Sequence, residues 1–237
     1  MFQQRNLNLS CGFSIRQDGD MSLACGNRDV SLENRRRFLD PLGVSCQSLI
    51  CAKQIHSSNI RRVGPEDKGR GGKSFDNSLI DTDGFITAEK GLALAVFTAD
   101  CLPIFFYDQS TPAIGLIHAG WRGTGEGIAA KAVKLLQDNF DSKPKDLRVT
   151  FGPCIGLCCY EVGLDFSKKF DYGFEERDGR YYLDLAGINK KQLLDAGVKS
   201  SNIFDDGGCT ACKNNEFFSF RREGDSAGRM ISVIMLK

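Results

Sequence analysis

The chain has 237 residues, and its 31 lysines and arginines nearly balance its 30 aspartates and glutamates. This balance excludes the basic excess that accompanies general nucleic-acid binding, so any anionic substrate must be met by a local cluster of cations. Because no Pro/Ser-rich linker or change of composition divides the sequence, we expect one domain over residues 1–237 with a substantial core.

The N-terminal segment MFQQRNLNLS lacks the apolar core of a signal peptide, and no run approaches the roughly 20 apolar residues of a membrane span. We therefore expect a cytoplasmic protein. The number of cysteines, ten, would be enough for a disulfide framework. However, a chain of this length needs no such bridges, and without an export signal the thiols should be reduced.

In the first 30 residues we expect short strands and turns, with 11–15 as the best strand. A helix should follow, capped by Ser31 and ending near Pro41 and Gly43. Its three arginines are expected on a solvated face. The residues expected near its buried side are Leu32, Arg36, Phe38 and Leu39.

The segment 48–52 is apolar and predicts a strand that leads to Lys53, Gln54 and His56. Residues 64–77 are polar and rich in glycine, which predicts a mobile surface loop that could lie over a site. This loop does not satisfy the phosphate-loop pattern between a strand and a helix, so we reject that interpretation. Residues 81–87 predict a turn and a short strand.

The stretch 92–124 organises the chain, because its two apolar runs, 92–96 and 114–117, predict buried strands. The first run leads to Asp100 and Cys101, with Pro103 expected to halt it, and the second leads to His118 and a glycine-rich turn. A thiolate and an imidazole at adjacent strand ends could share a metal or act as nucleophile and base.

The chain has only two histidines, and the second candidate imidazole is His56. Together His56, Cys101 and His118 would give three ligands and an open fourth position, as in a catalytic zinc site. The alternative is that Cys101 is a buried core residue and the histidines are hydrogen-bonded structural groups. Because the residues are scattered over about sixty positions, spacing alone leaves both interpretations open.

After Arg122, residues 125–140 have helical periodicity, and the first amides of such a helix would suit an anion near His118. We expect strands at 147–151 and 181–185, and helices at 160–170 and 189–196. Separate reduced thiols are favoured over a second, structural zinc for the remaining cysteines of this half. These are Cys154, Cys158, Cys159, Cys209 and Cys212.

The C-terminal part predicts a strand at 217–222, a turn, and a final strand from Met230 to Leu236. It carries Arg221, Arg222 and Arg229. Side chains alternate along a strand, so Arg221 and Arg222 should face opposite ways. Guanidinium groups suit phosphate or carboxylate, and we expect at least one of the three to contact substrate.

Several ordered motifs, TADCLPIFF, IHAGWRGT, GPCIGLCCYEVG and CT followed by FFSFRR and GR, closely resemble the laccase-domain or polyphenol oxidase family. This family includes bacterial peptidoglycan-editing factors and a purine-nucleoside-metabolising enzyme of mammalian macrophages. The resemblance runs from about residue 10 to the end. It implies that His56, Cys101 and His118 bind zinc, within an α+β fold of mixed β-sheets flanked by helices.

Copper fits this sequence less well than zinc. A multicopper oxidase needs a three-copper cluster held by many imidazoles, and two histidines cannot supply it. The resemblance instead implies phosphorolysis of adenosine, inosine, guanosine and methylthioadenosine, together with adenosine deamination. Zinc lowers the pKa of bound water toward 7, which accounts for deamination. Phosphorolysis also needs a bound phosphate and a proton for the departing base.

For the catalytic site we expect Asp83 or Asp100 to orient ligands or move a proton, although either could be a simple turn residue. The expected substrate-binding residues are Lys53, Gln54, Arg122, Arg221, Arg222 and Arg229. The partners would be a purine nucleoside and phosphate, without a membrane, in a monomer or small homo-oligomer. The alternatives are an amidase that edits a UDP-linked peptidoglycan precursor and a non-enzymatic metal-bearing binding protein.

Overall fold

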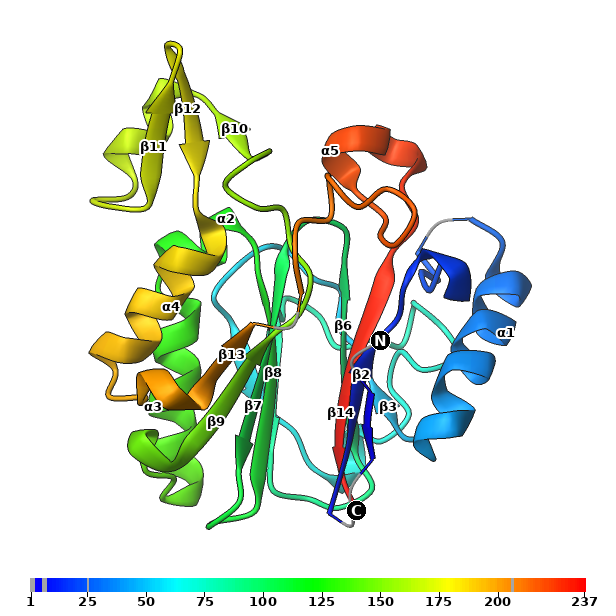
Figure 1. Ribbon diagram of the computed structural model, residues 1–237. Helices are drawn as coiled ribbons and strands as arrows, with labels where there is room; N and C mark the ends of the chain where they lie inside the picture. The colour runs from blue at the N-terminus through cyan, green and yellow to red at the C-terminus, as the bar shows by residue number, and fades with distance from the viewer. Residues whose placement is uncertain (1–2, 6–7, 25, 206) are drawn as a thin grey trace.

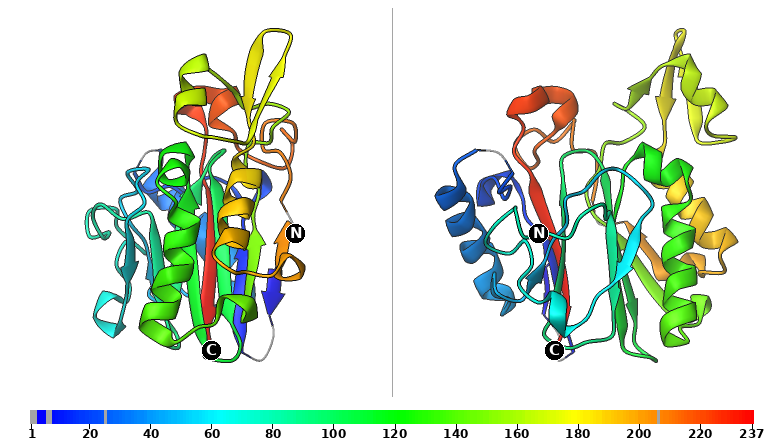
Figure 2. Two further views of the ribbon diagram at one scale, coloured as in Figure 1. Left: turned by 90° about the vertical axis from the view of Figure 1, so that its left-hand side faces the viewer. Right: turned by 180° about the vertical axis from the view of Figure 1, so that it is seen from behind.

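The computed structural model describes residues 3–5, 8–24, 26–205 and 207–237. Two β-sheets face each other, with helices on the outer side of both (Figures 1 and 2). Helix α1 (Arg28–Leu39) covers one sheet, and α3 (Ile128–Phe140) and α4 (Leu185–Asp195) cover the other. The predicted α+β fold of mixed sheets flanked by helices is therefore confirmed.

The first sheet surrounds the C-terminal strand β14, which pairs antiparallel with both of its neighbours. Side chains of β14 alternate between the two faces: Ile231 and Val233 pack toward α1, whereas Met230 and Ile234 pack toward the other sheet. In order, the strands are β1 (Gln3–Arg5), β2 (Leu9–Phe13), β14 (Met230–Leu236), β6 (Ala93–Thr98) and β3 (Leu49–Ile50).

The second sheet combines parallel and antiparallel pairs, and its central strands β7 and β8 form an antiparallel pair. Its outer face packs on α3 and α4, and its inner face packs on the first sheet. In order, the strands are β13 (Ile203–Asp205), β9 (Leu147–Phe151), β7 (Leu102–Asp108), β8 (Ala113–Ala119), β5 (Gly84–Thr87) and β4 (Ile60–Arg62).

A small third sheet projects above the larger two at the upper left of Figure 1. It contains β10 (Glu161–Val162), β12 (Arg180–Leu183) and β11 (Phe174–Arg177). The expected helix at 160–170 is wrong, because this segment holds β10 and the 3₁₀ segment Leu164–Lys168. The strand expected at 181–185 is confirmed as β12 with shifted ends, and α4 begins before the expected position 189.

Strand β7 was missed because Pro103 was expected to end the preceding strand. In the structure, β6 ends at Thr98 and a new strand begins at Leu102. Proline is tolerated near the start of a strand. The ladder between β7 and β9 begins only at Ile104, so Pro103 does not have to donate a hydrogen bond to β9.

Helix α1 begins three residues before the expected cap. Asn27 is the N-cap and accepts from the amides of Asp29 and Val30, whereas Ser31 is buried inside the helix. The expected solvated face is also wrong for Arg35, which is 2% exposed. The Arg35 guanidinium donates to the carbonyls of Met21, Gly71 and Gly72, and so it holds the glycine-rich loop against α1.

The segment expected to be a strand at 217–222 instead contains the short helix α5 (Phe220–Glu223). Ser219 caps this helix by accepting from the Arg222 amide. The alternation argument for Arg221 and Arg222 therefore does not apply. The strands expected at 147–151 and 230–236 are confirmed as β9 and β14.

The predicted short strands of the N-terminal region correspond to β1 and β2. The parts of that prediction at residues 1–2, 6–7 and 25 lie outside the described residues. Among the described residues, no helix is both long and apolar enough to span a bilayer.

Candidate metal centre and substrate cavity

His56, Cys101 and His118 converge at one end of the space between the two sheets. Their possible ligand atoms all lie within 4.8 Å of one another. The two imidazole rings meet edge to face, with 4.9 Å between their centroids. His56 is exposed, Cys101 is half-buried and His118 is buried, so this group opens toward the surface on the His56 side.

The pairing of β7 with β8 brings Cys101 to His118. Pro103 lies opposite His118 across this pair, and Cys101 precedes β7 directly. The predicted adjacency of the two side chains is thus correct, but its cause differs, because β6 belongs to the other sheet. Cys101 lies where the chain crosses from the first sheet to the second.

Asp83 connects the two histidine segments and is fully buried. Its carboxylate lies 2.8 Å from Nδ1 of His118 and accepts from the backbone amides of His56 (3.0 Å) and Ser57 (2.7 Å). The contact at Nδ1 leaves Nε2 of His118 for a metal. A carboxylate behind a ligating histidine fixes its tautomer and ring orientation.

Asp100 holds a different part of the site. It has a positive φ of 89°, which is uncommon for a residue other than glycine. Its carboxylate accepts from Thr210 Oγ1 at 2.6 Å and from the Arg221 amide at 2.7 Å. Asp100 therefore fixes α5 and the preceding loop beside Cys101. His56 also has a positive φ, of 61°, and such backbone strain concentrates at functional sites.

Gly120 lets the three candidate ligands approach each other. A Cβ added at this position would lie 3.1 Å from the Cys101 sulfur and 3.1 Å from Cδ2 of His56. Any larger residue would therefore push the ligands apart.

Charge and hydrogen bonding prepare the site for a cation. Burial raises the pKa of the Cys101 thiol, but the charge of His118 and hydrogen bonds from both histidines lower it to about 6. Burial lowers the pKa of His118, but the Cys101 thiolate and Asp83 raise it to about 9. Two imidazoles and a thiolate are the donor types that zinc prefers, so the residues present fit a metal.

The three candidate ligands lie in the wall of a cavity of about 700 Å³. This volume falls within the usual range for sites that bind small molecules. Gly71 and Phe75 from the 64–77 loop line it, which confirms that this loop borders the site. The aromatic side chains of its wall are those of Phe75, Phe97, Trp121, Tyr160 and Phe220.

The three C-terminal arginines have different surroundings. Arg221 and Arg229 line the cavity. The Arg221 guanidinium lies 5.5 Å from the centre of the Tyr160 ring and makes no hydrogen bond to another described residue. The Arg222 guanidinium is used internally, because it donates to the carbonyls of Thr210, Ala211 and Phe217.

Lys53 and Gln54 also line the cavity, whereas Arg122 does not. The amide group of Gln54 is paired with the backbone of Phe97 in both directions, at 2.9 and 2.8 Å. Arg122 is exposed, and its guanidinium lies 5.1 Å from the Trp121 ring. The periodic helix α3 begins only at Ile128, and the five-residue helix α2 (Trp121–Gly125) separates it from His118.

Sequence reasoning missed the roles of Tyr160 and Arg35 in the cavity wall. Tyr160 belongs to the GPCIGLCCYEVG motif, where the cysteines dominated the interpretation. Burial raises the pKa of its phenol above the usual value, so it stays protonated near neutral pH. Arg35 gave no signal beyond its place in a run of three arginines.

Comparison with known proteins places this geometry in a family. The family model described as multi-copper polyphenol oxidoreductase laccase matches residues 7–237. Purine nucleoside phosphorylase YlmD of Geobacillus stearothermophilus is 38% identical over 226 residues, which cover 91% of this chain and 82% of that protein. Adenosine deaminase RL5, from an unknown prokaryotic organism, is 30% identical over 215 residues, covering 87% and 82%.

A solved structure extends this similarity to the fold. The crystal structure of YlmD from Geobacillus stearothermophilus matches with a TM-score of 0.93 and 34% sequence identity, and the match covers 100% of this chain and 98% of that one. The match of sequence and fold extends over nearly the whole chain. The chain therefore belongs to the family described as multi-copper polyphenol oxidoreductase laccase.

Proposed function

We propose that this protein is a zinc-dependent purine nucleoside phosphorylase that also deaminates adenosine. Its substrates would be adenosine, inosine, guanosine and methylthioadenosine. The observation that carries this proposal is the meeting of His56, Cys101 and His118 in a cavity of about 700 Å³. Relatives named purine nucleoside phosphorylase and adenosine deaminase support the same substrate class.

The donor set favours a single zinc over a copper cluster. The chain has only two histidines, and a three-copper cluster needs many imidazoles. When bound by His56, Cys101 and His118, zinc would supply Lewis acidity that brings the pKa of water toward 7. Asp83 would keep Nε2 of His118 directed to the metal through its contact with Nδ1.

The cavity wall offers separate partners for base and phosphate. Aromatic rings such as Phe75, Trp121 and Tyr160 can pack on a planar purine. Arg221 and Arg229 supply positive charge for phosphate, and Arg221 has its guanidinium available. In phosphorolysis a phosphate oxygen bonds to C1′ of the ribose while the bond from C1′ to the base breaks.

The departing purine must gain a proton, and we assign its delivery to Tyr160, which regains a proton from the hydrogen phosphate that bonds to C1′. This phenol lines the cavity and, like an ordinary tyrosine, is protonated near neutral pH. Asp100 positions Arg221 by accepting from its amide. We further propose that residues 1–237 form one catalytic domain and that the protein acts in the cytoplasm, where thiol ligands stay reduced.

The proposal is tested by incubating purified protein of known metal content with adenosine, with and without phosphate, and separating the products. Adenine and ribose 1-phosphate should form only with phosphate, whereas inosine should form without it. Cys101→Ala should abolish both reactions. Cys46→Ser should keep both, because this half-buried thiol lies outside the cavity wall.

Failure of the zinc-loaded protein to convert any purine nucleoside would overturn the proposal. The same protein should then be tested for amide hydrolysis of a UDP-linked peptidoglycan precursor. Formation of adenine in Cys101→Ala at the wild-type rate would show that phosphorolysis occurs elsewhere.

A further inference from the structure

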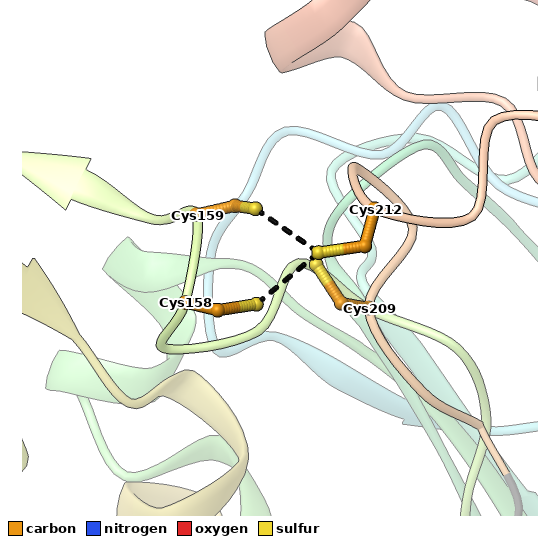
Figure 3. A group of neighbouring side chains, drawn as sticks. All are labelled: Cys158, Cys159, Cys209 and Cys212. Carbon is orange, nitrogen blue, oxygen red and sulfur yellow. Dashed lines mark hydrogen bonds between the residues drawn. The ribbon is translucent and has the colours of Figure 1, made fainter.

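Four cysteines form a second group of potential ligands, apart from His56, Cys101 and His118. Cys158 and Cys159 extend from the loop after β9, and Cys209 and Cys212 extend from the loop before α5, so that the four sulfurs face one another (Figure 3). We call these residues the four-cysteine cluster. Cys154, which the sequence analysis grouped with them, is instead buried in the core that the second sheet forms with α3 and α4.

The spacing of the sulfurs fits tetrahedral coordination. All four sulfurs lie within 4.8 Å of one another, and the Cys212 sulfur is 3.4 Å from that of Cys158 and 3.3 Å from that of Cys159. A zinc ion at about 2.3 Å from each sulfur would separate the sulfurs by about 3.8 Å. A disulfide would join only two of them, at about 2.05 Å.

The backbone around the cluster holds these thiols in place. The Gly156 amide donates to the Cys209 sulfur at 3.3 Å, and the Cys159 amide donates to the Gly156 carbonyl at 2.9 Å in the turn that presents the two adjacent cysteines. A Cβ added at Gly156 would lie 3.2 Å from Cβ of Cys209 and 3.3 Å from the Cys158 sulfur. Glycine at this position therefore lets the two loops close on each other.

We propose that Cys158, Cys159, Cys209 and Cys212 bind one structural zinc ion. Each thiol would lose its proton and form one Zn–S bond, with no change of oxidation state. Four sulfur ligands fill a tetrahedral shell, so this ion would have no open position for a substrate. Cys209 and Cys212 have the two-residue spacing that is common in structural zinc sites.

Such an ion would clamp one wall of the cavity. The Cys158 loop continues directly into Tyr160, and the Cys209 loop continues to Arg221. The Arg221 guanidinium lies against the Tyr160 ring, so each loop carries one partner of this contact. Between Cys209 and Cys212, Thr210 donates to Asp100 beside Cys101. The two loops are otherwise joined mainly by the short pairing of Cys154 with Cys209. We infer that the ion keeps Tyr160 and Arg221 in register.

The test is the zinc content of protein purified under reducing conditions with zinc in the medium. Wild type and Cys46→Ser should hold about two zinc ions per chain, and Cys212→Ser should hold about one. Cys101→Ala should retain the cluster's zinc. Because Cys212 is exposed, its replacement by serine should leave the fold intact, which far-ultraviolet circular dichroism checks.

Two further measurements separate this inference from the proposed function. Cobalt substitution should give a tetrathiolate absorption spectrum in Cys101→Ala that is absent in Cys212→Ser. If Cys212→Ser does not fold, alkylation of wild type with iodoacetamide and peptide mass spectrometry serves instead, because added zinc should protect Cys158, Cys159, Cys209 and Cys212. Equal zinc content in wild type and Cys212→Ser, no protection, or a disulfide among the four in reducing buffer would overturn the proposal.

Discussion

The His56, Cys101 and His118 group and the four-cysteine cluster are close neighbours, connected through the hydrogen bond from Thr210 to Asp100. The first combines two imidazoles with one thiol and lies in the wall of a cavity. The second has four thiols from two loops and no nitrogen donor. Three protein ligands leave a position for substrate, whereas four complete a tetrahedron. The comparison shows that the number of donors separates a proposed catalytic site from a proposed structural one.

The two groups also differ in what supports them. Asp83 stands behind His118 and holds the His56 segment through backbone amides. The four-cysteine cluster is supported instead by the backbone of a turn, where the Gly156 amide donates to the Cys209 sulfur and the absence of a side chain lets the loops approach. Precise orientation by a buried carboxylate matters where a metal takes part in a reaction.

The largest expected effect is that of His56→Asn. Asparagine tolerates the positive φ at this exposed position, so the fold should persist while one imidazole is lost. We expect phosphorolysis to fall by roughly 10³-fold, because the reaction loses the metal's contribution. Zinc at the four-cysteine cluster should remain, as measured by metal analysis. Wild-type turnover in His56→Asn would contradict the assignment of this ligand.

Asp83→Asn should weaken metal binding at His118 by roughly 10- to 100-fold. The substitution replaces one carboxylate oxygen with an NH₂ group, which cannot accept a hydrogen bond from His118 Nδ1 or from the Ser57 amide. Competition with a chelator measures the affinity. Asp81→Asn is the matched control, since Asp81 is exposed, has a positive φ that asparagine tolerates, and accepts from Asn59 through its backbone carbonyl. Equal affinities in the two variants would remove Asp83 from the site.

Metal affinity at the first group should rise with pH. Below a pKa of about 9 the metal-free His118 carries a proton that zinc must displace, and below about 6 Cys101 is protonated as well. The affinity should therefore rise about tenfold per pH unit between these values, and more steeply below them. Release of about one proton when zinc is added at pH 7.5 to metal-free Cys212→Ser, in which the cluster should not bind zinc, checks this with an indicator dye. A pH-independent affinity would show that the pair is not the binding site.

The smallest expected effects are those of replacing Arg221 and Arg222, and they should differ in kind. Arg221→Ala should raise KM for phosphate about fivefold, corresponding to about 1 kcal/mol, with little change in kcat. Arg222→Ala should instead lower the melting temperature by a few degrees, because its guanidinium holds loop carbonyls beside the cluster. Steady-state kinetics with varied phosphate and thermal unfolding measure the two effects. A larger change of KM in Arg222→Ala would reverse these roles.

Some of the site was readable from the sequence because its signals are local. The strands that carry or precede the candidate ligands have apolar runs, and their polar ends marked Cys101 and His118. His56 joined the group because the chain has only two histidines, and the motif resemblance then implied that all three residues bind zinc. The meaning of Pro103 was not local, since a proline that ends one strand and a proline that starts another look alike. Only the pairing of β7 with both β8 and β9 distinguishes them.

The sequence by itself determined the family resemblance, the mixed α+β composition and the three candidate ligands. Tertiary structure decided that Arg35 is buried and that Arg221 lines the cavity while Arg222 holds a loop. It also decided that two pairs of cysteines meet, although Cys212 follows Cys158 by 54 residues and Cys159 by 53. The physical reason is that periodicity and capping act over a few residues. Contacts between distant loops depend on how whole sheets pack.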